Sequence, residues 1–250
     1  MWRRHDNTSL KLSFLPVKSP RSSSARFDRR LRHHLVLAAA STALGLLIAP
    51  LHGTADLREQ VSIATAYIGL TWVAASLLLG PLNLLRGRPN PVSTDLRRDI
   101  GIWGGIAGLA HLAVGLTVHM RGKMAEYFLA PARSGGFPVR IDAFGLANHM
   151  GLMSGLILLA LVVLSSDWTL RRLGAARWKR WQRWNYVCAA ALVAHGALYQ
   201  LLEKRRFVLV AAFVLIAAVA TSAQMAGVGV RRRARGRQID AQSLGEADQL

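Results

Sequence analysis

The sequence lacks two features that many redox proteins carry. Cys188 is its single cysteine, so we expect no internal disulfide bond and no cysteine-based metal site. A module that binds flavin and nicotinamide needs a βαβ region with a Gly-rich phosphate turn. The roughly twenty residues after Val230 are too few to form one. We therefore expect that this chain does not oxidise a nicotinamide by itself.

Acidic residues are also scarce. The chain has 13 Asp and Glu against 32 Lys and Arg, which gives a net charge of +19. Such a charge is common in nucleic-acid binders, but 52% of the residues are hydrophobic and much of this content is gathered in long apolar runs. A soluble nucleic-acid binder would not carry such runs, so we expect no nucleic-acid partner and take the lipid bilayer as the anionic surface instead.

Six apolar runs are long enough to cross a membrane. A transmembrane helix needs roughly 20 apolar residues, and only helices satisfy the backbone of such a segment in hydrocarbon. The sequence therefore predicts an all-α integral membrane protein, a bundle of six transmembrane helices. The runs are approximately His34–Leu51, Val61–Gly80, Ile100–Met120, Phe144–Leu164, Trp184–Leu202 and Phe207–Val230.

The basic residues predict the orientation of this bundle. With the N-terminus inside, 24 Lys and Arg fall on the cytoplasmic side and eight on the other. Short cytoplasmic loops are enriched in these residues, so both termini are expected in the cytoplasm. We expect residues 1–33 to be a basic disordered tail, 34–230 the transmembrane domain and 231–250 a second cytoplasmic tail. A bacterial inner membrane fits the short basic loops.

Two histidines lie near the middle of apolar runs. His111 follows Arg98 by thirteen residues, and His195 follows Arg183 by twelve. At 1.5 Å per residue, both rings lie about 18–20 Å along helices that enter from the same side. An ionisable ring at this depth usually faces a partner inside the bundle. We therefore predict that the two rings meet and share a ligand.

Small residues surround both histidines on their helix faces. Gly104, Gly108 and Gly115 share the face of His111, and Ala191 shares that of His195. Small residues in membrane helices commonly serve close helix packing. A planar macrocycle with axial imidazoles explains both the bare faces and the histidines, because haem iron commonly takes a histidine ligand.

Two groups of motifs stand out around these histidines. The first is LRRLG at 170–174 and WKRWQR at 178–183, followed by Tyr186, His195 and Tyr199, and the second is RRDIGI at 97–102 with LAHL at 109–112. Together they resemble the ferric reductase-like transmembrane domain family, over roughly residues 60–220. That family includes ferric reductases, NADPH oxidases and the haem-binding membrane subunit of the bacterial periplasmic methionine-sulfoxide reductase system. The resemblance implies a six-helix haem b protein that moves electrons across the membrane, with His111 and His195 as iron ligands.

The sequence departs from the family pattern at Gln182. The family commonly carries two histidines thirteen residues apart on the fifth helix, and Gln182 stands thirteen residues before His195. The resemblance therefore implies one haem between His111 and His195. A second redox centre on the cytoplasmic side would be a flavoprotein partner, a quinol or a differently ligated haem.

Three further histidines fall near the opposite surface. His52 ends the first run, His119 ends the third and His149 lies early in the fourth, which runs the other way. His119 with His149 could bind a second haem or a metal. The alternative is that these are interfacial histidines hydrogen-bonded to loop backbone.

The favoured hypothesis is an oxidoreductase membrane subunit rather than a complete enzyme. By resemblance, its haem b passes electrons from a cytoplasmic flavoprotein or a quinol to an acceptor on the outer side. FAD or FMN would then come only through a partner, and a quinone cofactor stays open. The alternatives are direct reduction of ferric chelates, a haem-free transporter that uses intramembrane histidines as proton relays, and a structural scaffold.

Overall fold

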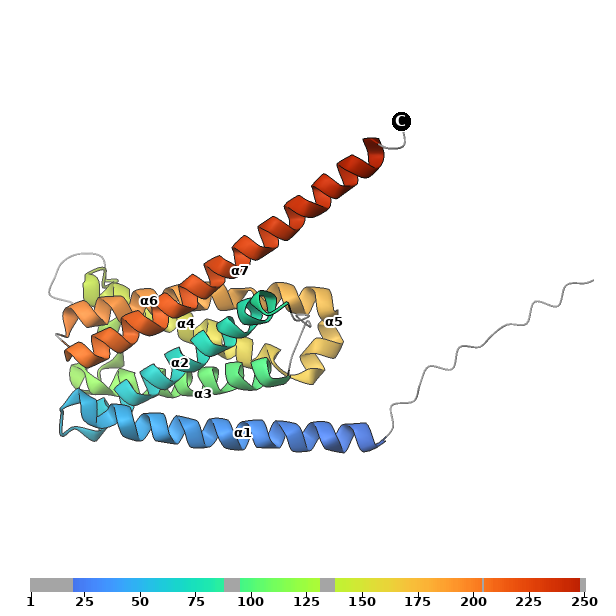
Figure 1. The fold of residues 1–250 in the computed structure, drawn as a ribbon. Coiled ribbons are helices and arrows are strands. Elements are labelled where there is room, and N and C mark those ends of the chain that lie inside the picture. The colour runs from blue at the N-terminus through green and yellow to red at the C-terminus, as the bar shows by residue number, and fades with distance from the viewer. Residues whose placement is uncertain (1–19, 88–94, 131–137, 204, 248–250) are drawn as a thin grey trace, which may run out of the picture.

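A computed structural model describes residues 20–87, 95–130, 138–203 and 205–247 (Figure 1). This part of the chain is a helical bundle without strands, apart from one isolated bridge between Leu129 and Val139. The prediction of an all-α fold is confirmed. The helices are α1 (Pro20–Ile48), η1 (Ala49–His52), α2 (Leu57–Leu85), α3 (Asp95–Val118), η2 (Met120–Gly122), η3 (Met124–Tyr127), α4 (Ala143–Leu164), α5 (Asp167–Gln182), α6 (Trp184–Leu202) and α7 (Phe207–Ala247).

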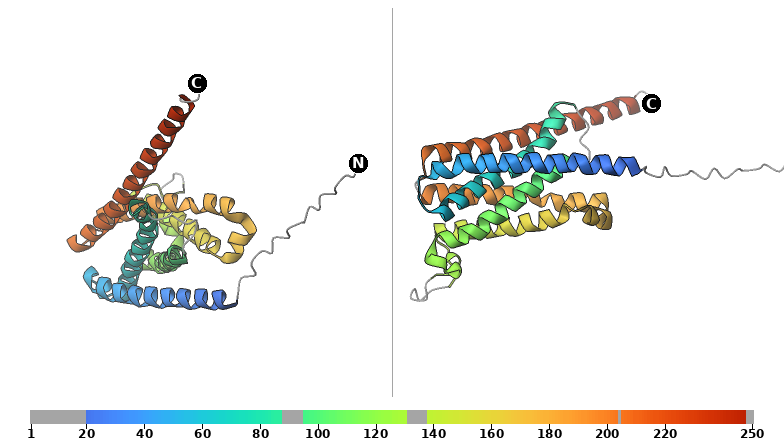
Figure 2. Two further views of the ribbon diagram at one scale, coloured as in Figure 1. Left: turned by 45° about the vertical axis from the view of Figure 1, so that its right-hand side comes forward. Right: turned by 90° about the horizontal axis from the view of Figure 1, so that it is seen from below.

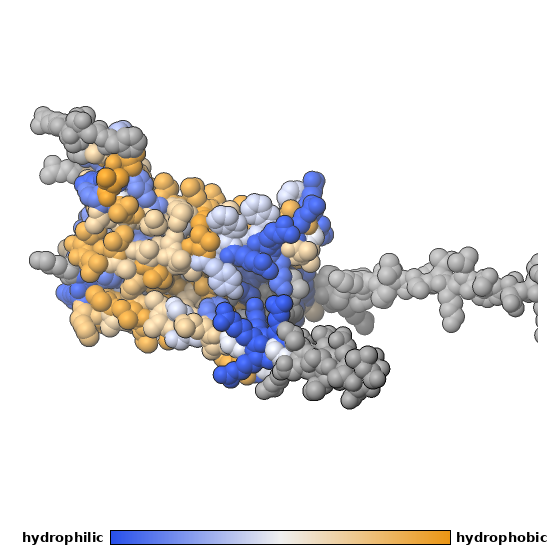
Figure 3. Space-filling model, turned by 90° about the horizontal axis from the view of Figure 1, so that it is seen from above, coloured by the Kyte–Doolittle hydropathy of each residue, from blue (hydrophilic) through white to orange (hydrophobic). Residues whose placement is uncertain are grey.

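Six spans among the described residues are long and apolar enough to cross a membrane, as predicted. They correspond to α1, α2, α3, α4, α6 and α7, with α5 running directly into α6. The third and fifth predicted runs are thus α3 and α6. Apolar side chains cover the middle of the visible face, and hydrophilic residues form a band at the end that holds α5 (Figure 3).

The short helix α5 crosses the end of the bundle (Figure 1). Its first turn is capped by Ser166, whose hydroxyl accepts a hydrogen bond from the backbone N–H of Thr169. Gly174 adopts φ 70°, which breaks the helix and turns its second half back toward α6. Trp178 then donates its ring N–H to the carbonyl of Leu164, 2.7 Å away, and holds α5 against the end of α4.

The helices begin and end outside the expected domain limits. Residues 20–33, expected in a disordered tail, belong to α1, and α7 continues as a helix through 247. Residues 1–19 lie outside the described part of the chain. Both α1 and α7 extend beyond the apolar bundle at the same end, where α7 projects away from its neighbours (Figures 1 and 2).

Ion pairs explain why α1 begins so early. Asp99 of α3 is fully buried and accepts hydrogen bonds from Arg30 at 2.7 Å and His33 at 2.9 Å. Arg98, on the same turn, is buried and pairs with Asp167 of α5 at 2.5 Å. This cluster gives the basic start of α1 partners that lie about seventy positions away in sequence, so the segment is ordered.

The interior differs along the bundle. Toward α5 it is filled by aliphatic side chains and one cysteine from α2, α4 and α6. Near the middle, α2 and α3 approach so closely that a Cβ on Gly69 would lie 3.1 Å from the backbone nitrogen of Gly108. Both glycines line a cavity that lies beyond the filled half. The filling cluster consists of Val73, Leu77, Leu158, Leu161 and Cys188.

Replacement of Asp99 by Asn should destabilise the bundle more than any other single change in the ion cluster. It leaves the partly buried Arg30 and His33 without the fully buried carboxylate that they share, which costs about 3 kcal/mol. Asp95→Asn is the matched control, because Asp95 pairs with the exposed Arg26 and should cost about 1 kcal/mol or less. Thermal unfolding of the purified protein in detergent, followed by helical circular dichroism, measures both. Equal losses would contradict the role given to Asp99.

Candidate functional site

A cavity of about 410 Å³ lies between α2, α3, α4, α6 and α7, in the half of the bundle away from α5. Volumes of this size are typical of sites for small molecules and cofactors. Its walls are mostly apolar. Polar groups gather at the end of the cavity farthest from α5, which we call the outer mouth. The polar and aromatic residues that line it are His52, Glu59, Ser62, Tyr67, His111, His119, Tyr127, Phe128, Asn148, Ser154, His195, Tyr199, Gln200, Glu203, Arg205 and Phe213.

His111 and His195 face each other in this cavity. Their ring centroids are 6.0 Å apart and the ring planes are inclined by 67°. One ring comes from α3 and the other from α6. The two rings therefore meet, as the equal depths along the two helices predict.

Both rings are held by backbone carbonyls of neighbouring helices. Nδ1 of His111 lies 2.9 Å from the carbonyl oxygen of Ser62, and Nδ1 of His195 lies 2.7 Å from that of Ala147. A carbonyl oxygen can only accept, so Nδ1 donates in both rings. In the neutral ring the lone pair is then on Nε2. This is the usual arrangement of metal-binding histidines, whose second nitrogen donates to a fixed acceptor.

Only some of the predicted small residues line the cavity. Gly108 and Gly115 do, but Gly104 lies against Val73 of α2, and Ala191 is buried outside the cavity. The sequence interpretation missed Gly151 of α4, where a Cβ would lie 2.7 Å from Nδ1 of His195. The spacing of the α4 glycines is the only sequence signal at this position, and it does not show that Gly151 faces His195.

Two tyrosines connect the histidines to the outer mouth. The Tyr199 ring lies 4.9 Å from the His195 ring, and its hydroxyl donates to Asn148 at 2.9 Å. Tyr127, which is only 1% exposed, donates to the carbonyl of Gly115 and accepts from the backbone N–H of His119. Tyr127 follows the end of α3 in a loop segment, where the sequence carries no periodic signal that would predict burial.

A chain of charged groups lines the outer mouth. Nε2 of His119 lies 2.9 Å from Glu203, and the other carboxylate oxygen of Glu203 lies 2.5 Å from Arg205. Arg205 also donates to Nδ1 of His52 at 3.4 Å, and Nε2 of His52 lies 3.6 Å from Glu59. Burial raises the pKa of Glu203, but contact with His119 and the charge of Arg205 outweigh it, so the pKa lies below its ordinary value.

The three outer histidines do not form one cluster. His52 and His119 line the cavity, but each contacts a different carboxylate. His149 lies outside the lining and its Nε2 is 3.2 Å from the carbonyl of Arg140, a loop contact. Within the described ranges, no group of three His, Cys, Asp or Glu side chains is placed to hold a metal ion.

Gln182 is remote from the cavity. It ends α5 at the opposite end of the bundle, and its buried side-chain nitrogen has no hydrogen-bond partner within the described structure. Between Gln182 and the His111–His195 pair lies the filled half of the interior, where Cys188 is fully buried. The structure therefore brings His111 and His195 together and leaves Gln182 apart.

Comparison with known proteins finds relatives among bacterial heme-binding subunits. A curated protein of Yersinia pseudotuberculosis serotype O:1b (strain IP 31758), the protein-methionine-sulfoxide reductase heme-binding subunit MsrQ, is 28% identical over 183 residues, which cover 69% of this chain and 79% of that protein. The protein of the same name from Yersinia pestis (strain Pestoides F) is 28% identical over 183 residues, 69% of this chain and 78% of its own. No protein-family model and no solved structure matches the chain.

Glu203 should make stability depend on pH. Because its pKa is lowered in the folded state, it stabilises the fold above its unfolded pKa of about 4.3, and this contribution is lost as the pH falls through the lower folded value. The stability difference between the unaltered chain and Glu203→Gln should thus be largest near neutral pH and should shrink below about pH 4. Thermal unfolding from pH 7 to pH 3 measures it.

The control for this pH series is Glu126→Gln. Glu126 forms an exposed ion pair with Lys123 between α3 and α4, and its loss should cost little at any pH. A Glu203→Gln difference that stays constant between pH 7 and pH 3 would contradict the assignment of a lowered pKa.

Proposed function

We propose that this chain is the haem-binding membrane subunit of a reductase and that it carries electrons through the bilayer. The observation that supports this best is the His111–His195 pair, two rings from different helices that face each other in a cavity with Nδ1 of each on a carbonyl. The names of the Yersinia relatives agree with this function. On the same basis we assign the chain to a methionine-sulfoxide reductase system.

The residues fit a haem. A metal–imidazole bond is about 2.0 Å long, so one metal ion held by two imidazole rings would need ring centroids about 6 Å apart. The observed separation of the His111 and His195 centroids is 6.0 Å. Gly108, Gly115 and Gly151 leave the walls beside both rings bare, as a flat macrocycle requires.

The side chains of this chain set the conditions for electron transfer. Haem b, when bound, supplies a one-electron iron couple. His111 and His195 would both hold the haem iron, which would suit electron transfer better than oxygen binding. The carbonyls of Ser62 and Ala147 fix the ring orientations, and the apolar walls limit the access of water.

We propose a single haem per chain. The half of the bundle toward α5 is filled by side chains around Cys188, and Gln182 stands where the resemblance implies a second ligand. A donor must therefore be a separate partner, a cytoplasmic flavoprotein or a quinol. With the basic end of the bundle in the cytoplasm of a bacterial inner membrane, the mouth with His119 and Glu203 faces the outer side, where the acceptor docks.

Single replacements of the two histidines test this proposal. His111→Ala and His195→Ala should each abolish the low-spin haem signal in a reduced-minus-oxidised visible spectrum, because each removes one axial ligand. The unaltered chain should contain about one haem. His149→Ala is the matched control, since His149 contacts loop backbone outside the cavity and should keep full haem content.

Retention of full haem in both single variants would overturn the assignment of the ligands. A chain that is folded, expressed with sufficient haem and still free of it would favour the transporter alternative. Two haems per chain would contradict the single-haem proposal.

Filling the cavity wall should also displace haem. Gly115→Leu adds a side chain where a Cβ already lies 3.7 Å from the His111 ring. Overpacking costs about 1–3 kcal/mol, so we expect about tenfold or more weaker haem binding, measured by titration of the haem-free protein. Gly229→Leu is the control, because nothing lies within 4 Å of a Cβ at Gly229 on α7. Equal affinities of the two variants would contradict the position given to the haem.

A further inference from the structure

A second, smaller cavity opens on the lateral surface of the bundle, near α5. It is an apolar groove of about 200 Å³ that runs along the last turns of α4, and it is separate from the His111–His195 cavity. Its floor is aliphatic, and its rim is made by two tryptophans. It is lined by Leu156, Ile157, Ala160, Leu161 and Leu164 of α4, Trp181 of α5 and Trp184 of α6.

The rim of this groove is fixed in place. Trp181 and Trp184 are about half exposed, at 51% and 48%, although both are large apolar side chains. Trp178, one turn before Trp181, is buried and bonded to the carbonyl of Leu164 at the end of the groove. The groove is thus built into the junction of three helices, and it opens where lipid would surround the bundle.

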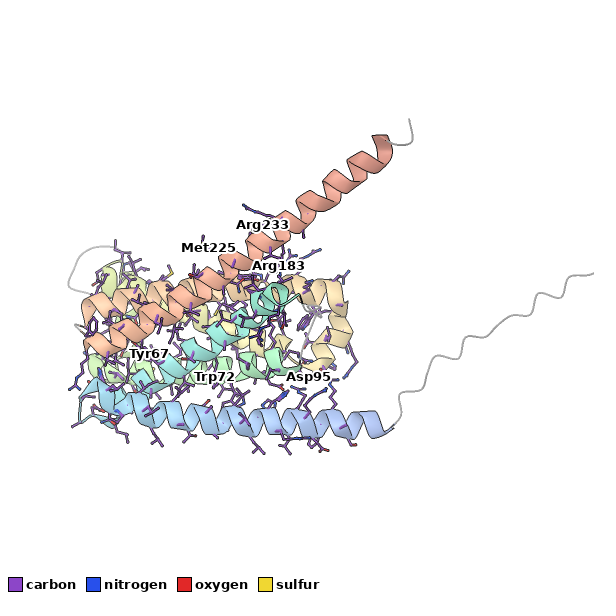
Figure 4. The ribbon with its side chains drawn as sticks, in the orientation of Figure 1. Tyr67, Trp72, Asp95, Arg183, Met225 and Arg233 are labelled. Atoms are coloured by element: carbon purple, nitrogen blue, oxygen red, sulfur yellow. The ribbon has the colours of Figure 1, made fainter. Side chains whose placement is uncertain are left out.

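Cations without carboxylate partners lie on α5 and at its end, the part of the chain that carries the groove tryptophans. Asp167 is the only acidic residue of α5, and it is already bound by Arg98 and Arg26. Arg180 directly precedes Trp181 in the chain and Arg183 directly precedes Trp184, and Arg183 lies near the end of the bundle (Figure 4). No carboxylate in the described ranges is within ion-pair distance of the exposed cations here, which are Arg171, Arg172, Arg177, Lys179, Arg180 and Arg183.

We infer that this groove binds one acyl chain of an anionic phospholipid, whose phosphate lies against Arg180 and Arg183. The aliphatic floor accepts only an apolar chain, and tryptophans favour the level of the lipid headgroups. The two arginines supply positive charge at that level, and each such charge strengthens binding to an anionic lipid by about fivefold. Zwitterionic lipids also carry a phosphate, but they have no net charge and so do not compensate the positive charge of the two arginines. The inference does not depend on the haem proposal.

The test uses the full chain with any bound cofactor, purified in a neutral detergent. Phosphatidylglycerol and phosphatidylcholine with identical acyl chains are titrated separately, and bound lipid is counted by native mass spectrometry. Phosphatidylglycerol should bind at one site at least about fivefold more tightly. Arg180→Gln/Arg183→Gln should abolish this preference, and Ala160→Phe, which fills the groove, should weaken both lipids.

Matched controls separate the groove from general charge and from misfolding. Arg232→Gln/Arg233→Gln removes two exposed cations from α7, which does not line the groove (Figure 4), and should leave the preference within twofold. Ala218→Phe adds the same bulk to an exposed position of α7 and should not change lipid binding. Helical circular dichroism verifies that each variant is folded.

Several results would overturn the inference. Equal affinity for the two lipids, or an equal loss in the α7 double variant, would mean that surface charge alone attracts the lipid. Unchanged binding in a folded Ala160→Phe variant would exclude the groove. Displacement of phosphatidylglycerol by the same concentration of inorganic phosphate would indicate a site for free anions instead.

Discussion

Hydrocarbon offers no hydrogen-bond partners, so each polar group within the bilayer needs one inside the protein. The structure meets this constraint at its centre by bonding His111 to the Ser62 carbonyl of α2 and His195 to the Ala147 carbonyl of α4. These bonds join α3 to α2 and α6 to α4. They also set which ring nitrogen carries the proton. Helix packing and the chemistry available at the two rings are therefore consequences of the same pair of contacts.

The two halves of the bundle accommodate polar groups in different ways. Near α5, the buried charges are compensated by ion pairs, as where Asp99 meets Arg30, and the adjacent interior is filled with aliphatic side chains. In the other half, glycines such as Gly108 and Gly115 line the cavity without adding side chains to it, and polar groups gather at the mouth of the cavity. The filled interior and the cavity therefore occupy opposite halves of the bundle.

Properties that depend on local composition were predictable from the sequence. The apolar runs predicted six spans, and residue counting along two helices predicted that His111 and His195 meet. The start of α1 was not predictable, because its order depends on Asp99, far away in sequence. Tyr127 was missed for a similar reason, since it is buried by contacts to Gly115 and His119 that only the folded loop creates.

The site residues expected from the sequence also divide into those that local periodicity places and those that depend on how helices pack. Side chains on one face of a helix recur periodically, and Gly108 and Gly115, which share the face of His111, line the same cavity. Gly104 shares their face but lies about one turn from Gly108 and three turns from Gly115, where it packs against Val73 of α2. Periodicity gives the direction of a side chain but not the depth at which two helices separate. That depth follows from the crossing of α2 and α3, which no single segment encodes.

The isolation of Cys188 has a practical consequence for mapping how the chain sits in a membrane. Its side chain is fully buried and its sulfur lies 3.6 Å from the Ser154 carbonyl, out of reach of water-soluble thiol reagents. A cysteine introduced at any exposed loop position would then be the single reactive thiol of the protein. Impermeant maleimides applied to intact cells could locate each loop on one face of the bilayer. Cys188 would not need to be replaced first, because it would not react.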